Sequence, residues 1–406
     1  LLTNPFGLWL GALSFKPSSG GDTLPRDPRL RLIQHYGPCS QAKSLLGLGL
    51  IILLPILRIA MGNLAHPFIA IISPQSHRIG LSLLRLFILS LCLSLAACSN
   101  QPAEYTCSPE AIRLNWAEPE ALKQTVATLS AAEFMGRKTQ TQGAAKTRDY
   151  LHSQYQQLGL TPWGETFEVP FEYATLFSQE TGSNMVALIP ARQSTHRWRI
   201  VVAHYDHLGM SGSKIYHGAD DNASGVAALL ALAAHWQAQL SAAPDSLPNI
   251  NLMFVATDAE EPGLFGSTAL VEQLKQRMPE AQFELMLNLD MIGHPSRPYA
   301  IYLEGSRNFY QFPQFRPMLN ANNRLCIKLS HPKPVGRSIQ STDWLRASDH
   351  YPFHKAKIPW LYFGVPTHPQ YHTPEDTPDT LDYVFLAAVT ESAFEILRLN
   401  GDFLKN

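Results

Sequence analysis

The stretch INLMFVATDAEEPG, residues 250–263, contains the pattern that decides the fold of this chain. Its first seven residues are mostly apolar, which is typical of a strand buried on both faces, and two adjacent glutamates follow. The same order recurs in RIVVAHYDHLG, from Arg199, and in ELMLNLDMIG, from Glu284. In each case an apolar run is followed at once by a histidine or an aspartate.

Segments with helical character separate these runs, so strands and helices alternate along much of the chain. We expect helices within 109–160 and over 223–240, 264–278 and 380–399, and further strands over 166–173, 183–190, 197–203 and 358–364. Continuous apolar strands alternating with helices predict an α/β fold, a three-layer α/β/α sandwich with a mostly parallel, mixed central sheet.

Polar side chains that can bind metal follow several of the predicted strands. They are His204, Glu260, Glu261 and Asp290. Ligands of such sheets bind beyond the carboxyl ends of the strands, so these side chains should meet there. Two further segments, HGADDNASG and YHTPEDT, add aspartates and a second histidine. This set suffices for two divalent cations that share one carboxylate, an arrangement that activates water for hydrolysis.

The distribution of charge excludes one class of partner. The net charge is −1, but eight of the 32 basic and two of the 33 acidic residues precede Cys98. The remainder therefore carries 24 basic and 31 acidic residues, a net charge of −7. Nucleic acid is not an expected partner, because phosphate binding needs a basic face.

Residues 78–100 have the composition of an export signal. Two arginines precede an apolar run that ends in Leu95-Ala96-Ala97-Cys98, which resembles a bacterial lipobox with Cys98 as the acylated residue. An ordinary cleaved signal and a short buried helix are the alternatives. On the lipobox interpretation, Ser99 favours the periplasmic face of the outer membrane. The lipid anchor at Cys98 would then be the only membrane attachment.

These observations divide the chain into four parts. Residues 1–77 are expected to be an upstream, poorly ordered segment, 78–97 a lipoprotein signal peptide, 98–108 a tether, and 109–406 the catalytic domain. The catalytic domain and its tether hold Cys107 and Cys326. An exported protein allows a disulfide between them, but two free thiols are equally consistent with the sequence.

Five motifs occur in the order found in one enzyme family: HYDHLG, GADDNASGVAALL, DAEEPGLFGS, NLDMIG and YHTPEDT. From about Glu133 to its end, the chain resembles the co-catalytic di-zinc aminopeptidases, the bacterial leucine aminopeptidase-like proteins of metallopeptidase clan MH. The resemblance implies a zinc-dependent exopeptidase that binds two Zn²⁺ ions and removes N-terminal residues from peptides.

The resemblance also implies a role for each site residue. Asp220 would bridge the two ions, next to a cis peptide bond between Asp220 and Asp221. His204 and Asp290 would complete one zinc site, and Glu261 and His372 the other. Glu260 would be the general base, and the carboxylate of Asp206 would hydrogen-bond the His204 ring. The expected ligands are His204, Asp220, Glu261, Asp290 and His372, and the expected catalytic residues are Glu260 and Asp206.

Several residues and functions stay open at this point. Asp349 and Tyr371 are candidates for substrate binding, and the segment from Phe309 is a candidate lid or rim that decides specificity. No ligand role is expected for His207 or for His217, His235, His294, His331, His354 and His368. The alternative functions are a glutaminyl cyclase-like acyltransferase with one zinc, a non-catalytic peptide-binding relative and a carboxypeptidase. The oligomeric state is not predicted.

Overall fold

The computed structural model describes residues 106–176, 178–331 and 343–404. The chain divides into two units, residues 1–104 and 105–406, and every described residue belongs to the second. The predicted upstream segment, the signal peptide and Cys98 lie outside the described residues. Within the described part of the chain, no helix is both long and apolar enough to span a bilayer.

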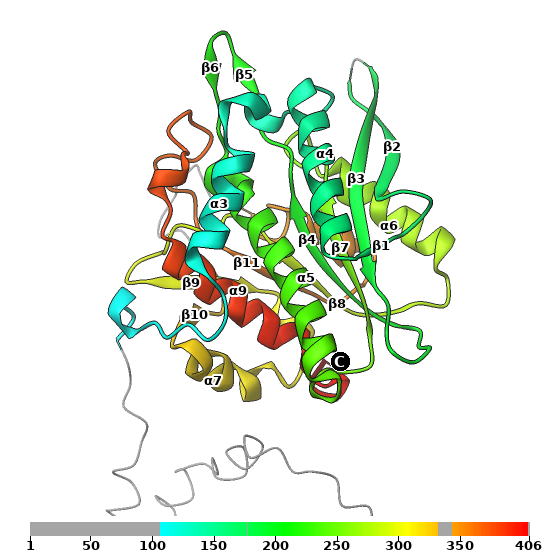
Figure 1. Ribbon diagram of the computed structural model, residues 1–406, viewed down its shortest axis with the longest axis vertical. Helices are drawn as coiled ribbons and strands as arrows, with labels where there is room; N and C mark the ends of the chain where they lie inside the picture. Colours follow the sequence, from blue (N-terminus) through cyan, green and yellow to red (C-terminus); the bar gives the residue numbers. More distant parts are fainter. Residues whose placement is uncertain (1–105, 177, 332–342, 405–406) are drawn as a thin grey trace, which may run out of the picture. The chain divides into compact units, whose positions relative to one another are not determined.

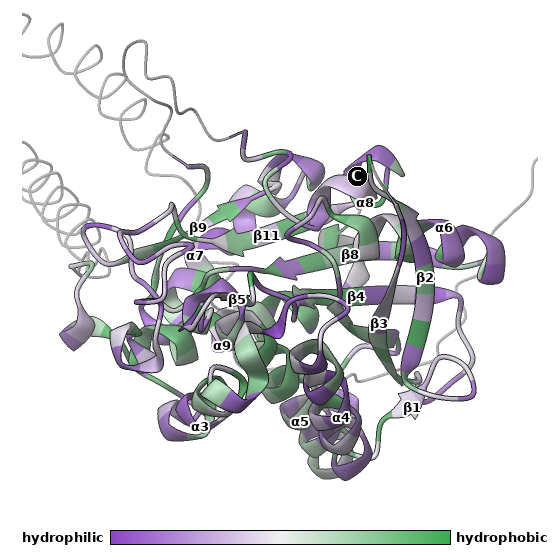
Figure 2. Ribbon diagram, turned by 90° about the horizontal axis from the view of Figure 1, so that it is seen from above, coloured by the Kyte–Doolittle hydropathy of each residue, from purple (hydrophilic) through white to green (hydrophobic). Residues whose placement is uncertain are grey.

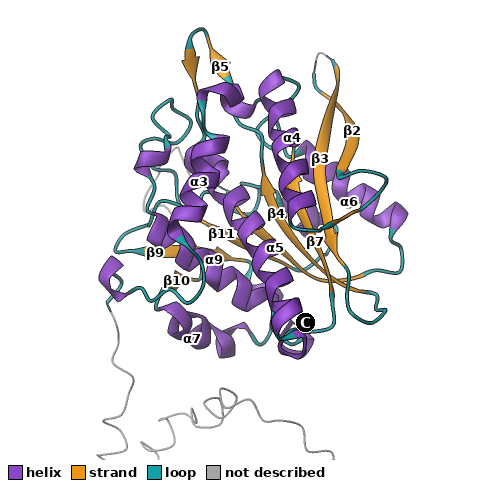
Figure 3. Ribbon diagram, in the orientation of Figure 1, coloured by secondary structure: helices purple, strands orange, loops and turns teal. Residues whose placement is uncertain are grey.

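A nine-stranded mixed sheet forms the centre of the second unit (Figure 3). Its order is β1-β3-β7-β4-β8-β11-β9-β10, with β2 paired to β3. The four central strands β7, β4, β8 and β11 run parallel to one another, and the pairs β3–β7 and β11–β9 are antiparallel. The strands are β1 Thr161–Pro162, β2 Glu168–Ala174, β3 Gln179–Ile189, β4 Arg197–His204, β7 Asn251–Thr257, β8 Gln282–Leu289, β9 Ala300–Glu304, β10 Cys326–Lys328 and β11 Trp360–Gly364.

Helices cover both faces of this sheet (Figures 1 and 2). One face is covered through the larger apolar cluster by α3, α4, α5, α7 and α9. The other face is covered through a smaller apolar cluster by α6 and α8. The fold prediction is therefore confirmed. The helices are α3 Pro119–Leu129, α4 Gln142–Gln157, α5 Gly225–Ala242, α6 Phe265–Arg277, α7 Phe312–Asn323, α8 His350–Lys355 and α9 Tyr383–Leu397.

The central strands form where the sequence is continuously apolar. Every residue of β7 is buried, and alternate residues belong to opposite apolar clusters. Leu252 and Phe254 face the larger cluster, whereas Met253 and Val255 face the smaller one. Successive side chains of a strand point to opposite faces of the sheet, so β7 contacts both apolar clusters and neither of its faces contacts water.

The outermost strand β2 has a different pattern. Its burial alternates strictly, with Val169, Phe171 and Tyr173 buried and Glu168 and Glu172 exposed. Only one face of β2 therefore contacts apolar neighbours. At the other end of the sheet, β10 is three residues long.

The segment from Phe309 is not a lid, so that expectation is wrong. Phe309, Phe312 and Phe315 are buried in the larger apolar cluster, and α7 packs on α9. Pro317 lies inside α7, which hides the helix from an analysis of sequence pattern. The aromatic side chains in this stretch are core residues.

Two long-range contacts attach the first described residues to the body of the domain. Cys107 and Cys326 form a disulfide with a Cα–Cα distance of 5.6 Å. Glu391 of α9 is fully buried, and its carboxylate accepts hydrogen bonds from the backbone N–H groups of Asn115, Trp116 and Ala117 at 2.6–3.0 Å. Of the two possibilities left open for the cysteines, the structure has the disulfide.

Replacing Cys326 with Ser should lower the free energy of unfolding by about 2–5 kcal/mol, because the disulfide closes a long loop in the unfolded chain. Urea denaturation under non-reducing conditions measures this change. Cys107→Ser and the double variant are matched controls that should show the same loss. A double variant much less stable than either single variant would show that the two cysteines act separately.

Candidate functional site

The carboxyl ends of the parallel strands β4, β7, β8 and β11 meet at one edge of the sheet. His204, the last residue of β4, is in register with Thr257, the last residue of β7. Leu289, the last residue of β8, is in register with Phe363 of β11. Side chains that directly follow these positions are thus brought together, as the sequence predicts.

One group of ligand atoms gathers around His204. Its Nε2 lies 3.3 Å from Asp290 Oδ1 and 3.3 Å from Asp221 Oδ1. Glu260 offers a further carboxylate oxygen to the group formed with His204 and Asp290. His204 is almost fully buried, so these contacts take place away from bulk water.

A second group lies on the other side of Asp221. His372 Nε2 is 3.1 Å from Asp221 Oδ2 and 3.2 Å from Glu261 Oε2. The other oxygen of Glu261 lies 2.8 Å from His207 Nδ1. The side chain of His372 is 34% exposed and that of His204 only 2%, so solvent reaches the site from the His372 side.

The residue between the two histidines is Asp221 and not Asp220, which corrects the prediction. Each Asp221 oxygen faces one histidine, whereas the Asp220 carboxylate contacts His294 and His368. The non-proline cis peptide bond joins Asp221 to Asn222, one residue later than expected. The sequence could not separate two adjacent aspartates, because the loop conformation alone decides which one points toward His204.

Asp206 is correctly placed beside the site, but the prediction for its carboxylate is wrong. The backbone carbonyl of Asp206 lies 3.1 Å from His204 Nδ1, and the carboxylate oxygen is 3.8 Å away. That carboxylate instead accepts hydrogen bonds from the N–H groups of Glu260 and Glu261, at 3.0 and 3.3 Å. Asp206 thus fixes the backbone of both glutamates.

Three more residues support the site, and little in the sequence indicates their roles. Asp376 accepts hydrogen bonds from the backbone N–H groups of Asp220 and Asp221, at 2.9 and 3.1 Å. Asn222 donates to the carbonyl of Leu289 at the end of β8. His207, expected to have no role, contacts Glu261. Asp376 lies within the YHTPEDT motif, so only its part in binding the loop was missed.

A fully buried arginine connects the loops around the site. Arg137 donates hydrogen bonds to the carbonyls of Tyr205, His217 and Gly218 at 2.7–2.9 Å. Burial lowers the pKa of Arg137 to about 10, although the nearby carboxylates of Asp376 and Asp221 oppose this shift. It remains charged at neutral pH and offsets part of the negative charge of the site.

The two histidines at Asp221 decide its charge. Burial alone would raise the pKa of Asp221, but the imidazoles of His204 and His372 hold it well below its ordinary value. Burial lowers the pKa of His372, yet hydrogen bonds to Asp221 and Glu261 raise it overall to about 10. In the absence of metal, protons on the histidines balance these carboxylates.

Glu260 has a different electrostatic environment from Glu261. Burial raises the pKa of Glu260 well above its usual range; His204 opposes this rise, and the carboxylates of Asp290 and Asp349 add to it. A carboxylate with a raised pKa can accept a proton at neutral pH more readily than an ordinary one. Positive charge beside it would favour its ionised form.

The two candidate substrate-binding residues lie close to the site. Asp349 is buried and accepts a hydrogen bond from the Thr257 hydroxyl at 2.5 Å, and its Oδ1 has no hydrogen-bond partner among the described residues. Tyr371 stacks on His372 with ring centroids 3.7 Å apart. An open pocket lies beside His372. It is lined by Lys214 and Ile215 of the β5–β6 hairpin (β5 Met210–Ser211, β6 Lys214–Ile215) and by the loop of residues 372–375.

The donor atoms fit two divalent cations. On each side of Asp221, one imidazole nitrogen lies 3.1–3.3 Å from two carboxylate oxygens. One of these oxygens belongs to Asp221, and the other belongs to Asp290 or Glu261. Ligand atoms bound to one tetrahedral zinc are about 3.3 Å apart, given bonds of about 2.0–2.1 Å. So many buried carboxylates also need positive charge nearby. His204, Asp221, Asp290, Glu261 and His372 would hold the ions.

The chain is similar to several known proteins. The family described as Peptidase family M28 matches residues 184–397. Aminopeptidase YwaD of Bacillus subtilis is 30% identical over 212 residues, which are 50% of this chain and 41% of that protein. The matched segments span 41–65% of the lengths of three curated relatives, so the chain covers about half of each.

Solved structures share the fold. The zinc aminopeptidase BSAP of Bacillus subtilis superimposes with a TM-score of 0.53 and 17% identity, covering 71% of this chain and 97% of that one. The glutaminyl cyclase of Fimbriiglobus ruber gives 0.55 and 18%, covering 74% and 99%. At such identities, the likeness concerns the fold alone.

Replacing Asp221 with Ala should abolish the binding of zinc by the two groups around it, because both lose their shared ligand and each histidine loses one of its two carboxylate partners. Metal analysis after dialysis measures this loss. Asp379→Ala removes an exposed carboxylate of the turn Pro378–Thr380 and should keep the wild-type metal content. An unchanged zinc content in Asp221→Ala would contradict the bridging position.

Proposed function

The chain belongs to peptidase family M28, and we propose that it is an aminopeptidase that binds two zinc ions and releases N-terminal residues from peptides. The observation that carries this proposal is the position of Asp221, which presents one oxygen to His204 and the other to His372. The similarity to an aminopeptidase of Bacillus subtilis supports it. His204, Asp221, Asp290, Glu261 and His372 would hold the ions, which would supply Lewis-acid polarisation of the scissile carbonyl and activation of water.

The residues of the chain supply the proton transfer and its geometry. Glu260 accepts a proton from the attacking water and donates it to the departing amine. The backbone N–H groups of Glu260 and Glu261 donate hydrogen bonds to Asp206. These bonds fix the backbone of the two adjacent glutamates, whose side chains take different roles. Glu261 faces His372 and His207, which leaves Glu260 on the side of His204.

The shape and charge of the site suit the free end of a peptide. A charged N-terminal amine needs a carboxylate, and the unpaired Oδ1 of Asp349 is the candidate for it. Tyr371 and the open pocket beside His372 would contact the adjoining residues of the substrate. The net charge of −7 after Cys98 supports peptides over nucleic acid as the partner.

A panel of aminoacyl-anilides tests the proposal. We expect release of aniline from substrates with a free amine, none from their N-acetyl forms, and loss of activity with a chelator that zinc restores. Cleavage of the N-acetyl substrates would contradict an aminopeptidase. Cyclisation of N-terminal glutamine without release of aniline would identify the chain as a glutaminyl cyclase instead.

Glu260→Gln should lower kcat roughly 100- to 10,000-fold, because the amide cannot accept the proton of the water. The zinc content should stay at the wild-type level, because Glu260 is the proposed base and is not one of the proposed zinc ligands. Glu272→Gln, a change on the surface of α6, is the matched control and should leave kcat unchanged. Wild-type turnover in Glu260→Gln would exclude Glu260 as the base.

We also propose that the protein is exported and attached to the periplasmic face of the outer membrane through a lipid on Cys98. The lipobox-like sequence before Cys98 supports this location. The disulfide between Cys107 and Cys326 supports it as well, because such bonds persist in oxidising compartments.

Cys98→Ser should move the protein from the membrane fraction to the soluble fraction, because the acylated side chain is the proposed anchor. Cell fractionation followed by detection of the protein measures the change. Ser99→Ala keeps the cysteine and should remain with the membranes. A Cys98→Ser variant that still sediments with membranes would rule out this anchor.

A further inference from the structure

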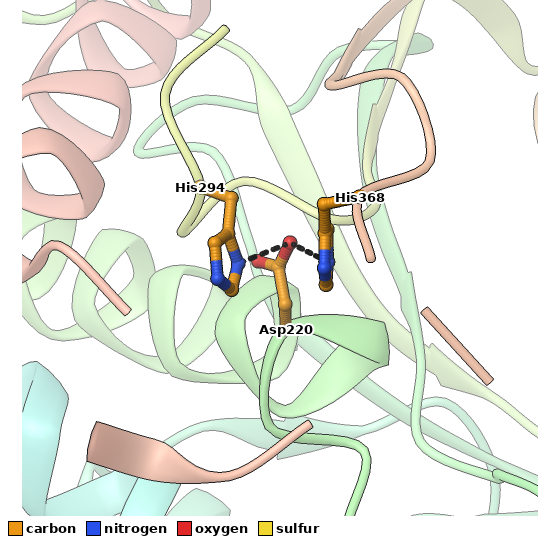
Figure 4. Close-up of side chains that lie close together, drawn as sticks. All are labelled: Asp220, His294 and His368. Carbon is orange, nitrogen blue, oxygen red and sulfur yellow. Dashed lines mark hydrogen bonds and ion pairs between the residues drawn. The ribbon is translucent and has the colours of Figure 1, made fainter. Parts of the chain in front are cut away.

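A second cluster of possible metal ligands lies next to the site already described. It consists of Asp220, His294 and His368 (Figure 4). Asp220 immediately precedes Asp221, His294 follows β8, and His368 lies in the loop after β11. These residues come from the same sheet edge as the aminopeptidase site, but the proposed zinc pair uses none of them.

The Asp220 carboxylate is fully buried, and its two oxygens have different partners. Oδ1 accepts a hydrogen bond from the N–H of Gly293 at 2.6 Å. Oδ2 faces two ring nitrogens, His368 Nε2 at 3.1 Å and His294 Nδ1 at 3.2 Å. The two imidazoles stack with centroids 3.9 Å apart, and both present a nitrogen to the same oxygen.

The ring of His368 is held on both sides, as the ring of a metal-binding histidine is. His368 Nδ1 lies 3.2 Å from the side-chain oxygen of Gln370, so Nδ1 carries the proton in the neutral ring. Nε2 also lies within hydrogen-bond distance of Asp220 Oδ2, so a proton on Nε2 satisfies this contact when no metal is bound. A divalent cation would take the place of that proton, with Nε2 as its ligand. Histidines that bind metal commonly donate their other N–H to such an acceptor.

His294 gives an independent sign of a missing partner. Its buried Nδ1 forms an ion pair with Asp220 Oδ2 at 3.2 Å, in a geometry that falls short of a hydrogen bond. A buried ring nitrogen without a hydrogen bond is unfavourable. A cation bound to Nδ1 and to the carboxylate would satisfy both atoms.

The spacing in this cluster matches the spacing around Asp221. There, nitrogen-to-oxygen distances are 3.1–3.3 Å, and here they are 3.1 and 3.2 Å. Two imidazoles and one carboxylate suit a borderline divalent ion such as zinc. His294 and His368 are only partly buried, so water can complete the coordination.

We propose that Asp220, His294 and His368 form a third divalent-metal site, separate from the proposed zinc pair. The two sites share one stretch of backbone, because Asp220 and Asp221 are adjacent and Asp376 accepts hydrogen bonds from both N–H groups. They also share one loop, in which His368 belongs to the third site and His372 to the pair. A metal at the third site therefore steadies both segments that carry ligands of the pair.

Zinc titration of the full chain tests the proposal. The metal-free protein, prepared by chelation, is titrated with Zn²⁺ at neutral pH and followed by calorimetry and by metal analysis after dialysis. We expect about three equivalents for the wild type and about two for the double variant His294→Gln/His368→Gln. His196→Gln, an exposed histidine, is the control and should keep three.

Asp220→Asn provides a second, milder variant. The amide keeps an oxygen for the Gly293 N–H but lacks the negative charge, so only the third equivalent should be lost. Asp221→Ala should show the opposite result and keep the third equivalent alone. A wild type that binds two equivalents, or a double variant that still binds three, would overturn the proposal and leave the His–Asp–His contacts as ordinary hydrogen bonds. This result does not depend on the aminopeptidase assay.

Discussion

The repulsion among buried carboxylates at the carboxyl edge of the sheet is the constraint on which the site depends. Asp206, Asp220, Asp221, Asp290 and Asp349 are all buried there. Anionic groups out of water are stable only when each one has hydrogen-bond donors or positive charge within reach. The backbone N–H groups of the loops, the imidazoles and the buried Arg137 supply part of this compensation. The need for more positive charge is the physical reason to place divalent cations among these residues.

The sequence predicted the central sheet well because its strands are buried on both faces. Such strands are continuously apolar, and the residues that follow them lie at one edge by topology alone. The sequence therefore correctly predicts that His204, Glu260 and Asp290 lie close together. By contrast, β9, α7 and α8 were missed, since a proline within a helix and short, partly polar segments carry no clear period.

The errors within the site have one physical origin. Asp220 and Asp221 are chemically identical. The loop conformation in which Asp221 faces His204 is held by the hydrogen bonds that Asp376 accepts from both N–H groups and by the one that Asn222 donates to Leu289. The atom of Asp206 that meets His204 also depends on the local backbone. Residue type and spacing report which groups are available, but loop geometry over a few ångströms decides the partner of each. For Asp220 and Asp221, that geometry arises from hydrogen bonds between residues 67 to 156 positions apart in sequence.

The strands at the two ends of the sheet have a consequence for the behaviour of the protein in concentrated solution. At one end, β2 exposes Glu168 and Glu172 and contains Pro170, and at the other, β10 has only three residues. Charges, proline and short length on an outer strand make it a poor template for backbone pairing with another polypeptide. These features disfavour edge-to-edge pairing between the sheets of different copies of the protein, and therefore disfavour aggregation by this route.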